Sequence, residues 1–182
     1  MSKTGIFLAD GCEEIEALTV VDLLRRAGLE IEMISISKSK TITGSHNISF
    51  LADVLFEDAG FDALDAIVLP GGMPGTLKLG EHEGVNSVIR KFAEEGKLVA
   101  AICAAPSVLG KAGILKGRRA VCHPGFEDKL DGASVSEDTV MTDGNLITSR
   151  GMGTAIDFGL AIVRYFKDDS AVSDLKQKLV YR

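Results

Sequence analysis

The chain has 182 residues, a formal net charge of −6 and a pI of about 5.1. This length suits one domain over residues 1–182 with a sizeable core, and an acidic chain without a Lys/Arg cluster is a poor match for nucleic acid or an anionic membrane. The longest uncharged apolar run, residues 98–109, is too short to cross a bilayer, and the N-terminus lacks the apolar core of a signal peptide. We therefore expect a cytoplasmic protein that binds neither nucleic acid nor membrane.

The first part of the chain alternates apolar runs with amphipathic segments. Residues 4–9 form an apolar run that ends at an Asp-Gly pair, which predicts a buried strand. In residues 13–28 apolar side chains recur every three positions, acids stand at the start, arginines near the end, and a glycine closes the segment, which predicts a helix. Residues 29–37 predict a second strand, and residues 41–50 predict a two-strand ribbon around a Gly-Ser turn.

The rest of the chain continues this alternation. Residues 98–102 are apolar on both faces, which predicts a central parallel strand covered on both sides. An Asp-Gly-Asn sequence predicts the turn of a hairpin over residues 139–149. The other predicted elements are strands at 65–72 and 118–123 and helices at 83–96, 105–113, 153–166 and the C-terminal end. This order favours an α/β fold with a mostly parallel sheet and helices on both faces, in which ligands bind at the carboxyl ends of the strands.

Cys103 stands where the strand at 98–102 is predicted to turn into a helix. Ala101 and Ala105 flank it two positions away on either side, and a sharp strand-to-helix elbow requires small residues there, as in the G-x-S-x-G turn. Pro106 fits the first turn of a helix, and a thiol at a helix N-terminus is favoured as the thiolate. The spacing is compatible with an activated nucleophile and with a small buried cysteine.

Two further features accompany this cysteine. Gly71 and Gly72 end a predicted strand, and a glycine turn there can direct an amide that forms an oxyanion hole with the N–H of Ala104; an ordinary strand-ending turn is the alternative. His123 ends another predicted strand and either orients the thiol or is a structural histidine.

Three carboxylates lie at the start of the first predicted helix. We expect Glu13 and Glu14 to be solvated caps favoured by the helix dipole. Glu16 lies on a different face of the helix, and if it turns toward Cys103 it is a buried acid with a raised pKa. We then expect a protonated Glu16 beside a thiolate, with the pKa of the thiol below about 8.5.

The cysteine and histidine patterns bear on redox and metal chemistry. Three cysteines without a CxxC pair predict reduced thiols in the cytoplasm, and Cys122 is either a second redox-active thiol or a buried structural cysteine. The histidines show no ligand spacing, so we expect no metal site. The absence of a phosphate-binding G-x-G-x-x-G sequence agrees with chemistry that uses no cofactor.

Five segments together resemble the DJ-1/ThiJ/PfpI superfamily, in particular its DJ-1-like branch. They follow the family order over nearly the whole chain and read "GCEEIEALTVVDLLRRAG", "DAIVLPGGMPG", "VAAICAAPSVL", "CHPGFEDKL" and "LITSRGMGTAIDFGLAIV". The resemblance implies a flavodoxin-like three-layer α/β sandwich and a homodimer. It makes Cys103 the nucleophile, Glu16 the protonated acid bonded to it and His123 a nearby histidine, and it places the amides of Gly72 and Ala104 at the oxyanion site.

The resemblance also implies a set of activities. These are the cofactor-independent conversion of methylglyoxal or glyoxal to a hydroxy acid, a protein deglycase activity on glycated adducts, and stress protection through cysteine oxidation or chaperone-like behaviour. In the enzymatic reading, Glu16 shuttles a proton between adjacent carbons of a substrate bound to Cys103. In the redox reading, the same thiol is the oxidised group.

Several residues depart from relatives. Ala104 follows the nucleophile where the PfpI-type protease branch has a histidine, which speaks against a peptidase. Arg26 matches one of two arginines that relatives carry at the mouth of the site, whereas His46 stands at the place of the other. Met152 replaces a proline and is expected to alter a pocket wall. A glutamine amidotransferase shares the elbow but needs a later histidine, and none follows His123.

Overall fold

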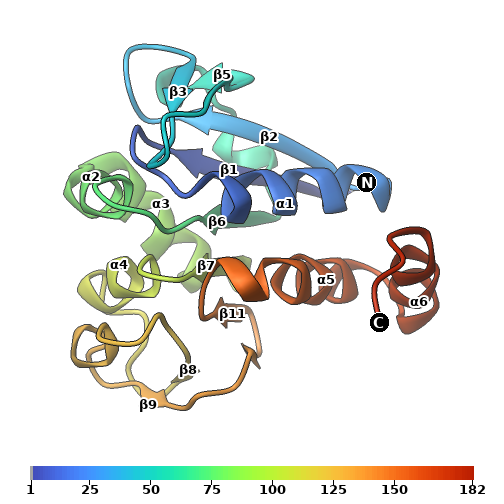
Figure 1. Ribbon diagram of the computed structural model, residues 1–182. Coiled ribbons are helices and arrows are strands. Elements are labelled where there is room, and N and C mark those ends of the chain that lie inside the picture. Colours follow the sequence, from blue (N-terminus) through green and yellow to red (C-terminus); the bar gives the residue numbers. More distant parts are fainter. Residues whose placement is uncertain (1) are drawn as a thin grey trace.

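A seven-stranded sheet forms the middle layer of the computed structural model, which describes residues 2–182 (Figure 1). Its order is β10-β11-β7-β6-β1-β2-β5, and among these strands only β10 runs antiparallel to its neighbour. The strands are β1 (Lys3–Leu8), β2 (Glu30–Ser35), β5 (Val54–Leu55), β6 (Ala66–Leu69), β7 (Leu98–Ile102), β10 (Val140–Asp143) and β11 (Leu146–Ser149). The predicted mostly parallel sheet is confirmed, and β1, β6 and β7 end side by side at one edge.

Helices cover both faces of the sheet, as the sequence predicts. They are α1 (Glu14–Arg26), α2 (Gly75–Glu81), α3 (Glu83–Glu94), α4 (Pro106–Lys111), α5 (Ala155–Phe166) and α6 (Asp169–Lys178). The central strand β7 shows the division, because Ala100 packs into the core formed with α1, α5 and α6, whereas its neighbour Ala101 packs into the core formed with α2, α3 and α4. Within residues 2–182, no helix combines the length and apolarity needed to span a membrane.

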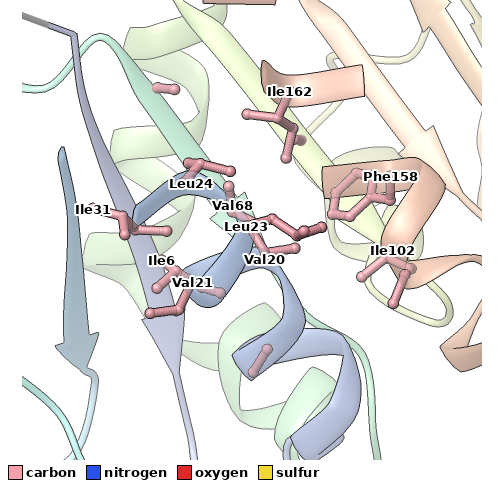
Figure 2. Packing of buried hydrophobic residues seen from close by; sticks show 14 of the residues in the cluster. Ile6, Val20, Val21, Leu23, Leu24, Ile31, Val68, Ile102, Phe158 and Ile162 are labelled. Atoms are coloured by element: carbon pink, nitrogen blue, oxygen red, sulfur yellow. The ribbon is translucent and has the colours of Figure 1, made fainter. Parts of the chain in front are cut away.

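The two long helices of the first face lie against each other (Figure 1). Figure 2 shows Val20 and Leu23 of α1 and Phe158 of α5 gathered over the strands, and all three side chains are buried. Gly159 permits this approach, because a Cβ at that position would lie only 2.5 Å from a Cδ1 atom of Leu23. The packing fixes α1 on the sheet, and with it the side chains of its first turn at the carboxyl edge.

The outer segments differ from the prediction in places. The strand predicted over 118–123 is wrong in extent, because β8 covers only Arg119–Ala120 and pairs with β9 (Ser134–Val135) in a separate two-stranded sheet. After β8, the N–H of Val121 donates to the hydroxyl of Thr148 instead of to a strand backbone. The ribbon predicted over 41–50 is present as β3 (Thr41–Thr43) and β4 (Ser49–Leu51).

Candidate active site

Cys103 forms the turn between β7 and α4. Its φ of +65° lies in the left-handed region, which is strained for a residue other than glycine. Two hydrogen bonds hold the turn: the N–H of Cys103 donates to the carbonyl of Ser149 at 3.0 Å, and the N–H of His123 donates to the carbonyl of Cys103 at 2.8 Å. The predicted elbow is confirmed, and it leaves this thiol partly exposed while Cys12 and Cys122 are buried.

Glu16 lies in the first turn of α1 and is 1% exposed. The carboxylate of Glu13, the N-cap residue, accepts the N–H of Glu16 at 2.7 Å and so begins the helix at this point. Oε2 of Glu16 accepts the N–H of Gly71 at 2.9 Å, and its carboxyl group makes a hydrogen-bonding contact with the thiol of Cys103. Its Oε1 has no hydrogen-bonding partner within residues 2–182. The structure therefore places Glu16 beside the thiol, as expected from the sequence.

Burial governs the ionisation of this pair. It raises the pKa of Glu16 to about 7, although hydrogen bonds from the thiol and from the amide of Gly71 oppose the rise. Burial, the negative charge of Glu16 and the hydrogen bond to it raise the pKa of Cys103 to about 12, against the amides of Ala104 and Gly72. The expectation of a thiol pKa below about 8.5 applies to a protonated Glu16, and for that state it stays a prediction.

The effect of Glu16 on the thiol depends on its own proton. Its Coulombic repulsion and its acceptor hydrogen bond both require the carboxylate form, so protonation of Glu16 removes both. Two negative charges in this buried contact oppose each other, so the pair loses its second proton less readily than its first. The apparent pKa values therefore belong to the pair of Glu16 and Cys103.

Two glycines form the wall opposite the thiol. A Cβ on Gly71 would lie 2.6 Å from the Cβ of Cys103 and 2.8 Å from Oε2 of Glu16, so a side chain at that position would displace both groups. Gly72 has a φ of +90°, which favours glycine. Its amide and that of Ala104 both lower the pKa of the Cys103 thiol. The role of these two amides as an oxyanion pair stays a prediction.

His123 borders the site without bonding to the thiol. Its Nδ1 lies 2.9 Å from the carbonyl oxygen of Pro124; because a carbonyl only accepts, Nδ1 carries the proton and donates it. The ring meets Phe126 edge-on, with centroids 6.3 Å apart. Its Cδ2 edge faces Gly151, which also lies next to Glu16. The group that orients His123 is thus the neighbouring backbone.

The structure does not bring Arg26 to this site. Arg26 lies in the last turn of α1, ten positions after Glu16, which corresponds to about 15 Å along a helix. Its Nε donates to the carboxylate of Asp22 at 2.5 Å, and the side chain is exposed. The expected role of Arg26 in substrate binding is wrong for the thiol of its own chain, because the helix axis carries it away.

The expectation for Glu14 is also wrong, because this side chain is buried rather than solvated. Its Oε1 accepts the N–H of His46 at 2.8 Å and that of Ile48 at 3.4 Å, and it thereby ties the β3–β4 turn to α1. Burial would raise the pKa of Glu14, but these amide hydrogen bonds lower it overall. Glu13 is the cap that the sequence predicts.

One group of side chains in the described part of the chain has a spacing suited to a metal ion. It consists of Glu13, Glu14 and His46, whose ligand atoms lie within 4.8 Å of one another. The carboxylate of Glu14 is already bonded to the amides of the β3–β4 turn. The sequence reasoning that excluded a metal missed this group, because its members come together only when the ribbon folds onto α1.

Gly151 is the site residue that the sequence reasoning missed. It precedes the short 3-10 turn Met152–Thr154 and faces both Glu16 and His123. The only signal in the sequence is its position between Arg150 and Met152 after the last strand. Met152 itself is about half-exposed.

Comparison with known proteins supports this picture. The model of the DJ-1/PfpI family matches residues 2–165. The Drosophila melanogaster protein dj-1beta is 36% identical over 183 residues, which cover 99% of this chain and 98% of that protein. A Pyrococcus abyssi protein named as a deglycase is 36% identical over 151 residues, or 81% of this chain and 89% of that one. Protein DJ-1 homolog B of Arabidopsis thaliana is 40% identical over 160 residues, which cover 87% of this chain and only 36% of that longer protein.

Solved structures agree over the whole chain. The oxidized form of Toxoplasma gondii DJ-1 matches with a TM-score of 0.95 and 31% identity, covering 100% of this chain and 99% of that one. Drosophila DJ-1beta matches with a TM-score of 0.95 and 36% identity, covering 100% of both chains. The fold is accordingly the flavodoxin-like sandwich expected from the sequence, and the chain belongs to the DJ-1/PfpI family.

Proposed function

We propose that this protein is a cofactor-independent enzyme of the glyoxalase and deglycase type, which converts methylglyoxal or glyoxal to a hydroxy acid. The observation that carries the proposal is the contact between the Cys103 thiol and the buried carboxyl group of Glu16, whose pKa of about 7 lets it hold or release a proton at neutral pH. The amides of Gly72 and Ala104 support it, because they reach the same sulfur.

In the proposed reaction, the thiol of Cys103 gives its proton to the carboxylate of Glu16, its sulfur bonds to the aldehyde carbon, and the π electrons of the carbonyl move to the oxygen. The amides of Gly72 and Ala104 hold that oxygen until it takes the proton back from Glu16 and the hemithioacetal is complete. Glu16 then removes the proton on this carbon and returns a proton to the neighbouring carbon through an enediol. The product is a thioester, which water hydrolyses to the hydroxy acid with release of the thiol. The net change is the addition of one water molecule, so no oxidant or reductant is consumed.

Formation of lactate from methylglyoxal, without added glutathione or metal, tests this proposal. We expect lactate from the wild-type protein, none from Cys103→Ser, and a loss on the order of a hundredfold or more for Glu16→Gln, as is usual for general acid–base groups. A wild-type rate in Cys103→Ser contradicts the proposal.

Glycated adducts are the second substrate class that we propose. The Pyrococcus abyssi relative is named as a deglycase. Cys103 can add to the aldehyde that an adduct releases, or to the imine carbon that forms when the adduct loses water while the amine is still attached. The two routes are separated by following a preformed adduct in the presence of a scavenger of free methylglyoxal. Adduct loss that stops when the scavenger is present assigns the activity to the free aldehyde.

A redox role for Cys103 is the alternative function. It is favoured by the partial exposure of this thiol and by the similarity to a DJ-1 structure from Toxoplasma gondii that is described as oxidized. Stoichiometric oxidation of Cys103 by low peroxide, together with no turnover of any aldehyde, would select this role over the enzymatic one. The redox alternative includes a chaperone-like stress function.

A cysteine peptidase has less support. Ala104 occupies the position after the nucleophile, and Nδ1 of His123 is bonded to the carbonyl of Pro124 instead of to the thiol. Absence of cleavage of an unfolded casein substrate under conditions that give lactate is the expected result.

We also propose a homodimer. Ile15 of α1 and Ile48 and Leu51 of the ribbon are 50%, 55% and 68% exposed. A groove beside α1 is lined by apolar residues that include Ile15, Ile48 and Ile156. Such an apolar face suits a two-fold contact with a second copy. Light scattering at micromolar concentration should give twice the chain mass, and Ile48→Glu should give one chain mass. Leu77→Glu, at an exposed position on α2, is the control.

A further inference from the structure

The space that a Cβ on Gly151 would occupy lies next to Glu16 and His123. A Cβ placed on Gly151 would lie 4.0 Å from Oε1 of Glu16 and 3.6 Å from Cδ2 of His123, both ordinary van der Waals distances. Within residues 2–182, these are the only atoms beyond the glycine and its chain neighbours that such a Cβ would meet within 4 Å. The space therefore has room for a carbon atom that the protein itself does not supply.

The two glycines of the site approach different oxygens of the Glu16 carboxyl group. A Cβ on Gly71 would meet Oε2 of Glu16 and, at 3.1 Å, the sulfur of Cys103, so the sulfur lies on the Gly71 side. Gly151 lies on the side of Oε1, the oxygen without a partner in residues 2–182. In the proposed reaction Glu16 serves two adjacent carbons, so we assign the carbon bonded to the sulfur to the Oε2 side of its carboxyl group and the next carbon to the Oε1 side, where Gly151 lies.

We propose that Gly151 sets the size of the substituent that the enzyme accepts on the carbon next to the one bonded to Cys103. The inference rests on the proposed function, in which Glu16 moves a proton between these two carbons. The hydrogen of Gly151 leaves the space to a small group such as the methyl of methylglyoxal. A Cβ at this position fills the same space and excludes that methyl, while glyoxal, which carries hydrogen there, still fits.

The backbone around Gly151 is held in place, so a substitution there changes the space and not the loop. The N–H of Gly151 donates to Oγ1 of Thr154 at 3.1 Å, and the N–H of Thr154 donates to the carbonyl of Gly151 at 2.8 Å. The same Oγ1 shares a hydrogen bond of 2.6 Å with the hydroxyl of Ser149. Gly151 has a φ of 164°, an extended value that alanine also adopts.

Gly151→Ala and Gly153→Ala form a matched pair of variants for the test. Gly153 belongs to the same turn, and within the described residues a Cβ there would meet nothing within 4 Å. We would measure kcat/KM for glyoxal, methylglyoxal and 2-oxobutanal, whose substituents are hydrogen, methyl and ethyl, and the midpoint of thermal unfolding for each protein.

The expected result is a change in preference. In Gly151→Ala, kcat/KM for methylglyoxal divided by kcat/KM for glyoxal should fall by about 10- to 200-fold, the usual effect of one misfitting methyl-sized group. The kcat/KM of this variant for 2-oxobutanal, relative to glyoxal, should fall by at least as much. Gly153→Ala should keep the wild-type ratios of kcat/KM among the three aldehydes. A wild-type ratio of methylglyoxal to glyoxal in a folded Gly151→Ala protein overturns the proposal.

Failure of the proposed function gives a different pattern. In that case the wild-type protein turns over none of the three aldehydes, and the space is tested by the labelling rate of Cys103 with iodoacetamide and with the bulkier N-ethylmaleimide. A selective loss of N-ethylmaleimide labelling in Gly151→Ala, absent in Gly153→Ala, supports the size limit at Gly151. An equal ratio of the two labelling rates in the wild type, Gly151→Ala and Gly153→Ala overturns it.

Discussion

The raised pKa of Glu16 makes the stability of the fold depend on pH in a direction opposite to that of most carboxylates. Burial raises this pKa from the ordinary value of 4.5 to about 7. Between these two values the folded protein holds a proton that the unfolded chain has already released. Glu16 therefore favours folding most at and below pH 4.5, and the stability of the fold decreases as the pH rises toward about 7.

The size of this effect follows from the same two values. The difference between 4.5 and about 7, at about 1.4 kcal/mol per pKa unit, corresponds to about 3 kcal/mol. The side chain is 1% exposed, so solvent screens little of it. Glu16→Gln keeps the shape and a hydrogen-bond donor but cannot ionise. The free energy of unfolding of the variant, minus that of the wild type, should increase by about 3 kcal/mol between pH 4.5 and about pH 7.5.

Urea denaturation at a series of pH values measures this difference. The other titrating groups are common to both proteins, and the coupled thiol of Cys103 has an ordinary pKa of 9.0, above this pH range. Asp22→Asn is the control, because this carboxylate lies on the exposed side of the same helix. A difference between Glu16→Gln and wild type that stays constant from pH 4.5 to about pH 7.5 would refute the reasoning, since it would mean that Glu16 titrates alike in the folded and unfolded chain.

Three further outcomes are expected from the site geometry. Cys103 should react with limiting iodoacetamide before Cys12 and Cys122, because it is the partly exposed thiol; peptide mapping that finds equal labelling would contradict this. Gly71→Ala should lower the thermal midpoint and abolish lactate formation, because its Cβ would lie 2.6 Å from that of Cys103. Full activity would show that the neighbouring residues can move to make room for the added Cβ. Glu14→Gln should lower the free energy of unfolding at pH 7 by about 1–3 kcal/mol in urea denaturation, because an amide cannot accept from every N–H that bonds to the carboxylate. An unchanged midpoint would show that Glu14 does not stabilise the contact between the β3–β4 turn and α1.

The fold could be predicted largely because its central elements carry local signals. The strand β7 is apolar at every position and coincides with the predicted 98–102. The helix α2 was missed, because it follows a glycine- and proline-rich loop and contains two glycines in seven residues, so its local sequence favours a turn. The short β8 was predicted too long, since the end of that segment bonds to a side chain of β11 and to the elbow, which are distant in sequence.

The residues of the site also divide into those with a local sequence signal and those that depend on distant contacts. The elbow at Cys103 follows from spacing within one or two elements, which a sequence displays, whereas the inward turn of Glu16 is implied only by the family resemblance. The burial of Glu14 depends on amides of the ribbon 32 and 34 positions away. Gly151 matters because it lies beside the space between Glu16 and His123. These three residues come from three separate segments of the chain. Contacts of this kind are decided by tertiary packing, and the local pattern carries no trace of them.

Glu14 and Glu16 show how that packing assigns chemistry to residue types that look alike. They stand two positions apart on α1, about 200° around the helix, and both are buried. Glu14 meets amides of the β3–β4 turn, which stabilise its charge and lower its pKa. Glu16 meets one amide and a thiol, and burial raises its pKa to about 7. The first acid therefore remains ionised and fastens the ribbon, whereas the second can give and take a proton near neutral pH. The number of donors that reach each carboxyl group, and not its place in the acidic stretch, decides which of the two is suited to proton transfer.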